Sequence, residues 1–246
     1  MSNRFLFCLI TAFLLFLTAC EERVEEFDLF LNQEYFPLAV GQTRIYQVDS
    51  INYISDGLIV DSVRSLVRER ITERLEDADG EEVYRLERSI RRDTSEAWQI
   101  ADVWVVSRDA AGAYRTEENL RFIKLVFPLT ENRQWNHNAF IDEQQFFRVG
   151  GDELVQVYRN WESRVANADT TVVVAGQEYN NVVVIIQADE DNRIEKRCVE
   201  EWYAEEVGLI YQEQLILDTQ STLSNAPWRE KAEKGFIVRQ QLVARN

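Results

Sequence analysis

Residues 170–186 read TTVVVAGQEYNNVVVII and contain the pattern that decides the fold. Two runs rich in β-branched residues, 170–174 and 182–186, lie on either side of the segment Ala175–Glu178. Valine, isoleucine and threonine are stiff at χ1 and pack well on a pleated surface. The stretch therefore predicts a strand, a turn and a second strand.

Outward from this hairpin, most of the chain alternates apolar and polar residues with a period of two, as in residues 84–90. Asp56-Gly57 and Asp79-Gly80 are hairpin dipeptides, because both residue types tolerate the positive φ of tight turns. The apolar residues of 62–75 fit a helix as well as one face of a strand, and the neighbouring hairpin signals favour a long strand. A short helix is predicted over Pro227–Lys234, where proline stands in the first turn and lysine near the end.

Composition supports a folded β domain. The 246 residues are 46% hydrophobic and 11% aromatic, which excludes a disordered chain, a coiled coil and a collagen-like rod. No linker-like segment interrupts residues 27–246. We therefore predict a mainly β protein with a single domain over 34–246, built on a long, antiparallel, strongly curved sheet (half-barrel or sandwich-like) with one or two short helices.

Charge and rare residues exclude several functions. The formal charge of −16 repels phosphate backbones, so we expect no nucleic-acid partner. One histidine and three cysteines without a CxxC pair leave little material for a zinc site or a Ser-His-Asp triad. We expect no cofactor, no metal and no catalytic residue, and we expect Cys198 to be a buried apolar residue.

The N-terminus predicts export and lipidation. Residues 1–20, MSNRFLFCLITAFLLFLTAC, combine Arg4 with an apolar run too short to span a bilayer. Leu17-Thr18-Ala19-Cys20 resembles the lipobox of bacterial lipoproteins, an ordinary secretory signal being the alternative. We predict a lipoprotein signal peptide over 1–19, lipidation (palmitate) at Cys20 and an acidic tether over 20–33.

The glutamates that follow Cys20 favour one of two locations. They resemble the surface-export signal of Bacteroidota-type lipoproteins, and a simple solvated tether is the alternative. The expected location is the bacterial outer membrane, with the lipid anchor as the membrane contact, on the periplasmic side or at the cell surface.

Three segments carry a family resemblance. Tyr35–Gly41 reads YFPLAVG, 172–182 reads VVVAGQEYNNV, and Trp202–Ile210 reads WYAEEVGLI. They resemble segments of uncharacterised Gram-negative (Bacteroidota-type) lipoproteins with the patterns Y-[FY]-P-L-x-x-G and W-[YF]-A-x-x-V-G-L-[IV]. The resemblance implies a curved antiparallel sheet similar to lipoprotein-carrier half-barrels, and it supplies no activity or catalytic residue.

Aromatic residues are the candidate ligand contacts. A β protein uses most of its tryptophans in the core and at its rim, but some can line a groove. The candidates are Trp98, Trp104, Trp135, Trp202 and Tyr203. Successive strand residues face opposite sides, so Trp202 and Tyr203 are predicted on opposite faces.

Other chemistry-bearing segments favour structural interpretations. His137 lies in a polar loop without a nucleophile motif, which predicts a loop or surface histidine. Asp77–Glu82 is too short for a calcium loop and is expected to be a hairpin tip. Glu200-Glu201 and Glu205-Glu206 beside Trp202 are the only hint of a carboxylate pair.

Three functional hypotheses remain open from the sequence. The first is a non-enzymatic binding or accessory lipoprotein whose concave β surface contacts a protein or an apolar ligand. The second is a surface glycan-binding lipoprotein, and the third is a carboxylate-dependent hydrolase.

Overall fold

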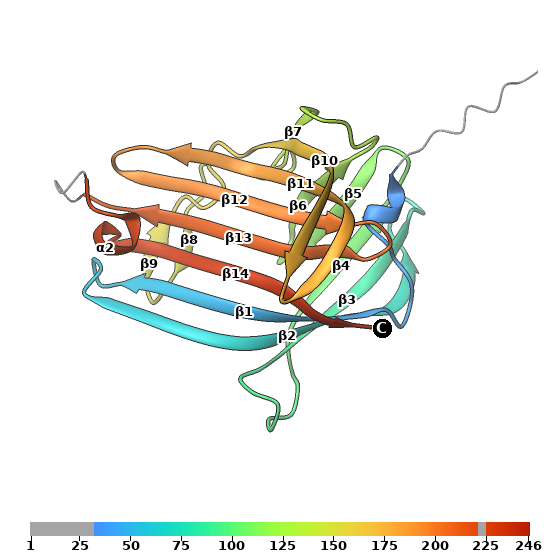
Figure 1. Ribbon diagram of the computed structural model, residues 1–246, viewed down its shortest axis with the longest axis horizontal. Coiled ribbons are helices and arrows are strands. Elements are labelled where there is room, and N and C mark those ends of the chain that lie inside the picture. The colour runs from blue at the N-terminus through green and yellow to red at the C-terminus, as the bar shows by residue number, and fades with distance from the viewer. Residues whose placement is uncertain (1–31, 221–224) are drawn as a thin grey trace, which may run out of the picture. The chain divides into compact units, whose positions relative to one another are not determined.

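The computed structural model describes residues 32–220 and 225–246 and is mainly β (Figure 1). The predicted signal peptide, the lipidation at Cys20 and the tether up to residue 31 lie outside the described residues. The elements are η2 (Gln33–Tyr35), β1 (Thr43–Ile54), β2 (Ile59–Glu76), β3 (Glu82–Arg91), β4 (Gln99–Arg108), β5 (Gly112–Glu117), β6 (Leu120–Val126), β7 (Gln134–Asn136), β8 (Phe147–Val149), β9 (Glu153–Val155), β10 (Glu162–Val174), β11 (Gln177–Asp191), β12 (Glu195–Ala204), β13 (Gly208–Asp218), α2 (Trp228–Lys231) and β14 (Lys234–Arg245).

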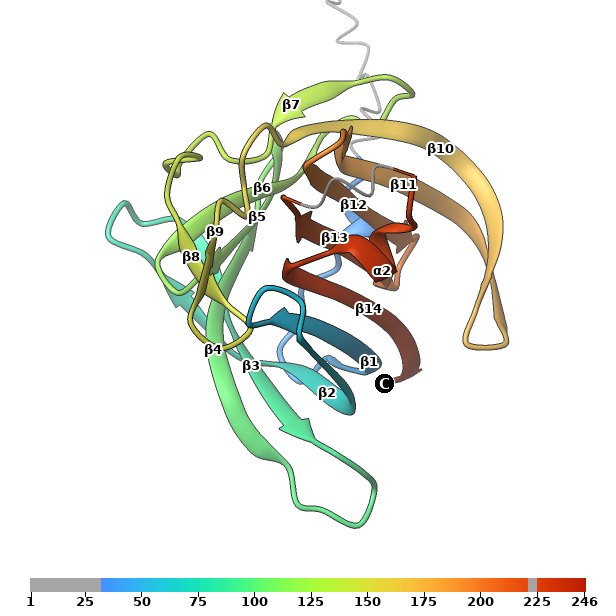
Figure 2. The ribbon, with the colours of Figure 1, turned by 90° about the vertical axis from the view of Figure 1, so that its left-hand side faces the viewer.

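Twelve strands form one antiparallel sheet in the order β6-β5-β4-β3-β2-β1-β14-β13-β12-β11-β10-β7. The sheet curves until its two edges meet (Figure 2). There the Ile123 N–H donates to the His137 carbonyl at 3.1 Å, and the Trp135 indole N–H donates to the Ile123 carbonyl at 2.9 Å. The prediction of a mainly β single domain with a strongly curved antiparallel sheet is confirmed.

The structure also decides the ambiguous segment and the predicted short helix. Residues 62–75 belong to β2, and every second side chain from Ser65 to Ile71 is buried, as a strand with one face inward requires. The predicted helix over 227–234 is too long, because α2 ends at Lys231 and residues from Lys234 pair with β13 as part of β14. Two short helical elements are described, η2 and α2.

The hairpin formed by β10 and β11 bends strongly. Three register irregularities separate Val165 from Val172, and bulges of this kind increase the twist and bend of a strand. Beyond the bend, Val172 and Tyr179 pack against the same apolar cluster as Trp202, a cluster that includes Val174 and Val182. Each described helix is too short or too polar to span a membrane.

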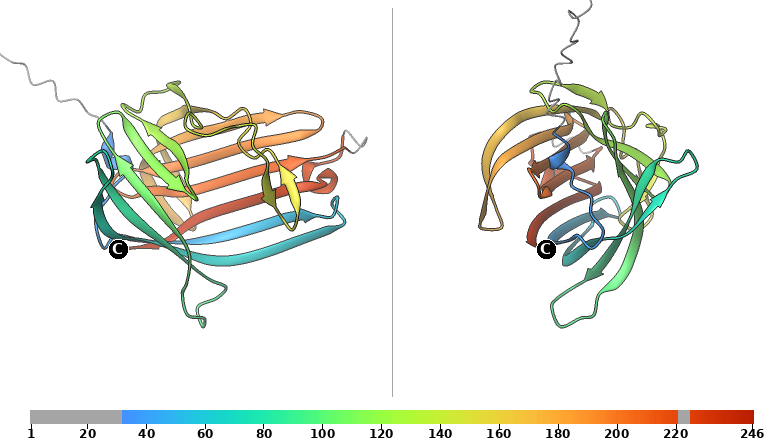
Figure 3. Two further views of the ribbon diagram at one scale, coloured as in Figure 1. Left: turned by 180° about the vertical axis from the view of Figure 1, so that it is seen from behind. Right: turned by 90° about the vertical axis from the view of Figure 1, so that its right-hand side faces the viewer.

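A second, two-stranded sheet covers part of the concave face. The β8–β9 hairpin contacts β14 from the inside (Figure 3). Val155 and Val157 pack with Val199 and Ile216 of the large sheet in an apolar cluster. The concave face is therefore closed by protein on this side.

Candidate functional site

The concave face changes from apolar to polar and back along three neighbouring strands. The apolar cluster at one end contains Ile185, Tyr203 and Leu209, and the cluster under the β8–β9 hairpin contains Ala188, Val199 and Ile216. Between the two clusters the inward side chains are Gln187 on β11, Glu201 on β12, and Gln212 and Gln214 on β13.

Strand register continues this polar band across the sheet. Gln212 pairs with Gln240 of β14, Gln240 pairs with Val48 of β1, and Val48 pairs with Ser65 of β2. Gln212, Gln240 and Ser65 are all buried. Because an unpartnered buried polar group costs about 1–3 kcal/mol, such a band needs partners, water or a ligand.

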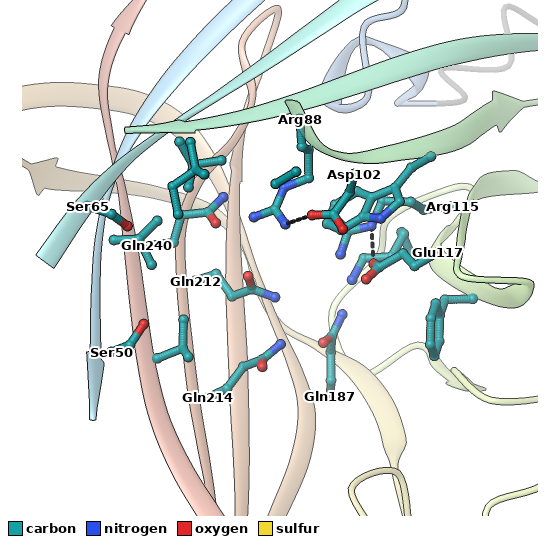
Figure 4. A pocket seen from close by; sticks show the side chains of 18 of the residues that line it. Ser50, Ser65, Arg88, Asp102, Arg115, Glu117, Gln187, Gln212, Gln214 and Gln240 are labelled. Atoms are coloured by element: carbon teal, nitrogen blue, oxygen red, sulfur yellow. Dashed lines mark hydrogen bonds and ion pairs between the residues drawn. The ribbon is translucent and has the colours of Figure 1, made fainter. Parts of the chain in front are cut away.

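The band borders an open cavity of about 350 Å³ inside the curved sheet (Figure 4). Amide and hydroxyl groups project into it from one side, and charged and aromatic groups come from the other. The aromatic wall consists of Trp104, Phe122, His137, Tyr158 and Trp161. Phe122, Tyr158 and Trp161 are in ring contact with one another or with His137, with centroids 5.0–5.4 Å apart.

Gln187 lines the cavity and lies at a β-bulge. Ile186 pairs with Glu200 and Ala188 pairs with Val199, so Gln187 is the extra residue of β11. Its amide N–H donates to Glu201 at 2.8 Å, while its carbonyl oxygen is buried without a hydrogen-bond partner among the described residues. The extra residue changes the parity of β11, so that Ala188 faces inward as well.

Glu201 joins the band to the opposite wall. Its fully buried carboxylate accepts hydrogen bonds from Lys124 at 2.7 Å, Gln212 at 2.7 Å, Gln187 at 2.8 Å and the Tyr203 hydroxyl at 2.6 Å. Burial raises the pKa of Glu201, but Lys124, other charges and the hydrogen bonds outweigh it and hold the pKa below its ordinary value. Both oxygens are saturated, so Glu201 serves as a structural anion.

The remaining charges at the cavity are also paired with one another. Arg88 forms ion pairs with Asp102 at 3.2 Å and Glu69 at 3.3 Å, and Arg115 pairs with Glu117. The guanidinium carbon atoms of both arginines lie over the Trp104 ring, at 4.1 and 4.8 Å from its centroid. The cavity thus offers hydrogen-bonding groups without an unpaired charge among the described residues.

His137 lies deeper than the sequence predicts. It lies in a turn after β7, as the prediction of a loop or surface histidine allows, but it is not at the surface, because the residue is only 2% exposed. Its backbone carbonyl closes the sheet at Ile123, which draws the ring inward between Phe122 and Trp161. Burial, together with Lys124 and Arg115, places the pKa of His137 well below its ordinary value. Its Nδ1 is buried without a partner in the described part of the chain.

The five candidate aromatics are spread over the domain. Trp104 lines the cavity, Tyr203 lies in the adjoining apolar cluster, and Trp135 holds the sheet edges together. Trp202 packs on Tyr211 on the convex face, with ring centroids 4.2 Å apart, so Trp202 and Tyr203 do face opposite sides. Trp98 stacks with two arginines before β4.

Sequence reasoning missed the glutamines. Gln212, Gln214 and Gln240 occupy inward positions in strands that otherwise carry apolar residues there. Their period-two placement was a usable signal. Gln187 carries the same signal, because it has the parity of the inward-facing Val183 and Ile185 in β11.

The acidic motifs form no reactive pair. Glu200 and Glu201 point to opposite faces of β12. Asp77 caps the turn at 77–81 through hydrogen bonds to the backbone N–H groups of Asp79 and Glu81, as expected for a hairpin tip. Among the described residues, no three His, Cys, Asp or Glu side chains gather as a metal site would need. Cys198 is half-buried on the convex face and is less enclosed than predicted.

Comparisons with known proteins give two similar folds. The chain matches no protein-family model and no curated protein. It is similar to a crystal structure from Bacteroides fragilis, described as an exported protein with a YmcC-like fold, at 12% identity and a TM-score of 0.42, covering 89% of this chain and 99% of that one. A lipoprotein structure from Parabacteroides distasonis is similar at 9% identity and a TM-score of 0.35, over 86% and 98%. The function proposed below therefore rests on the residues of this chain itself.

Proposed function

We propose that this protein is a lipid-anchored, non-enzymatic binding lipoprotein of the cell envelope, which holds a small, neutral, polar ligand inside its curved sheet. The observation that carries the proposal is the cavity of about 350 Å³ bordered by the glutamine band. Ligand pockets of small molecules begin at about 300 Å³ and contain a few convergent polar groups on a largely preformed wall. The anchor is the predicted lipid at Cys20.

The lining favours a polar ligand over the apolar ligand expected first. The side-chain amides of Gln214 and Gln240 form no hydrogen bond with other described residues, so they offer both donors and acceptors. Gln187 adds an unpartnered carbonyl oxygen. An apolar ligand would leave these groups unpaired, at about 1–3 kcal/mol each.

Charge pairing at the cavity favours a neutral ligand. Each of the three cations and four carboxylates around it is held in an ion pair. Groups that alternate donors and acceptors suit hydroxyl-rich molecules, so a neutral saccharide is the second, more specific candidate. The same pairing supports a non-enzymatic role, because it leaves no carboxylate free to act as a general acid or base.

Titration calorimetry on the full-length, detergent-solubilised protein tests the proposal. The probes are neutral mono- and disaccharides and a fatty acid, and we expect binding of polar probes only. Gln240→Leu should abolish this binding, because it removes an amide from the band. Gln241→Leu changes the adjacent residue of β14, which faces the convex side, and should bind as the wild type does.

Two outcomes would overturn the proposal. One is tight binding of the fatty acid with no binding of any neutral polar probe. The other is equal affinity of the Gln240→Leu and Gln241→Leu variants for the polar probe, which would place the ligand outside the band.

A further inference from the structure

Two guanidinium groups pack on one indole ring on the convex face of the sheet, away from the cavity. The guanidinium carbon of Arg91 lies 4.2 Å from the Trp98 ring centroid, and that of Arg68 lies 4.8 Å from it. Arg68 pairs with Ser89, and Leu66 pairs with Arg91 across β2 and β3. Both arginines therefore leave the sheet on the side opposite to the buried Glu69.

Neither guanidinium has a counter-ion among the described residues. Arg68 donates only to the Ser89 hydroxyl at 3.4 Å, and Arg91 donates only to the Thr94 carbonyl at 3.5 Å. Both distances are at the long end for hydrogen bonds. The Nε atoms of both arginines are enclosed without an acceptor. Each side chain thus keeps unused donors.

Two other arginines on the same face, in contrast, have counter-ions. Arg64 on the same strand pairs with Asp49 at 2.5 Å, and Arg85 pairs with Glu87 at 2.9 Å. Asp93, two residues after Arg91, accepts hydrogen bonds from the Ser95 N–H and hydroxyl; these bonds, with a contribution from Arg91, lower its pKa. The Asp93 carboxylate is therefore used to hold the turn at residues 93–95.

A chain with a formal charge of −16 has many carboxylates to place beside these cations, yet none is in contact with them in the described part. Two like charges against one ring repel each other unless an anion lies between or beside them. Arginine presents a planar fork of donors that matches phosphate oxygens, and an aromatic platform holds that fork in place. Exposed Arg70 is the next outward-facing residue of β2.

We propose that the Arg68–Trp98–Arg91 cluster is a binding site for a phosphate group, either free or carried by a larger molecule such as a phospholipid headgroup. The site is independent of the ligand proposed for the cavity. The site lies on the convex face of β2 and β3, and phosphate binding requires both guanidinium groups.

Calorimetric titration of the full-length protein with inorganic phosphate, at constant ionic strength, tests this site. We expect one site on the wild type and at least tenfold weaker binding for Arg68→Gln and for Arg91→Gln. Arg64→Gln removes the same charge from the same face, but from an arginine that already has a partner, and should bind phosphate as the wild type does. Glycerophosphoglycerol, a soluble phosphodiester headgroup, is the second probe. Tighter binding of the diester indicates a lipid source, and tighter binding of the monoester indicates a free phosphate compound.

The proposal is overturned if the wild type binds neither probe, or if the two cluster variants and Arg64→Gln lose affinity equally. If a glutamine variant loses its circular dichroism spectrum, Arg68→Lys and Arg91→Lys replace it. Lysine keeps the charge but lacks the fork, so these variants should bind phosphate severalfold more weakly, and unchanged affinity would also overturn the proposal.

Discussion

At the scale of single residues, Glu201 decides whether the polar interior is stable. Its partner Lys124 is as deeply buried, and the removal of one member of such a pair leaves an uncompensated charge. We predict that Glu201→Gln lowers the free energy of unfolding by about 3–5 kcal/mol, measured by urea denaturation. The double variant Glu201→Gln with Lys124→Met should recover much of this loss, because it removes both charges.

An exposed ion pair provides the control for Glu201. Arg164 and Asp189 form a pair at 2.9 Å at the surface, and Arg164→Gln should cost less than about 1 kcal/mol. If Glu201→Gln costs no more than this control, the buried network does not stabilise the domain.

His137 is the only histidine of the chain, and histidine is the side chain whose ordinary pKa lies between about pH 5 and 8. We therefore expect His137 to make the stability of the domain depend on pH in this range. Burial depresses its pKa in the folded state, so below the ordinary value of 6.5 the unfolded state takes up a proton that the folded state does not. Stability therefore falls as the pH falls, and we predict a loss of about 2 kcal/mol between pH 7 and pH 5. Denaturation of His137→Gln should show a much flatter dependence in this window. Parallel pH curves for the variant and the wild type would contradict the assignment.

At the scale of elements, Gly235 controls the packing of β14 on β13. A Cβ atom there would lie 1.9 Å from the Ile216 carbonyl oxygen, and the residue has a φ of +108°. We predict that Gly235→Ala destabilises the domain by at least about 3 kcal/mol, measured by thermal and urea unfolding. Gly80→Ala is the matched control, since its φ is +83° and nothing lies near its Cβ; backbone strain alone should cost about 1 kcal/mol. Equal losses would show that strain, rather than the close approach, explains the effect.

The strands were predictable from sequence because their signals are local. Period-two patterning and Asp-Gly turns predicted the strand at 62–75, although helical spacing competed there. The end of α2 was mispredicted because pairing with β13 extends β14 up to Lys234, and such pairing is not visible in the local pattern. The site was harder to predict for the same reason. Which glutamines meet depends on the register of strands distant in sequence, and the local pattern does not contain that register.

At the scale of the whole domain, the function proposed for the cavity depends on the closure of the sheet. The cavity has a His137 wall only because the segment after β7 lies beside β6, at the far edge of a sheet of twelve strands. Two hydrogen bonds at Ile123 make this junction, one through the backbone and one through the Trp135 indole. The sheet edges are therefore held by far fewer bonds than any two neighbouring long strands.

Trp135→Phe removes the indole donor while it keeps an aromatic ring in the apolar cluster beside it. The loss of one hydrogen bond costs about 1 kcal/mol. Here it lowers the free energy needed to open the junction locally, which hydrogen exchange measures. We predict that the amide hydrogen of Ile123 exchanges about fivefold faster in this variant, measured by NMR, while the amides of β13 and β14 are unchanged. Trp202→Phe alters an indole on the convex face and should leave Ile123 protected. Equal protection of Ile123 in the wild type and in both variants would contradict this prediction. It would show that the sheet edges are held together independently of the Trp135 indole.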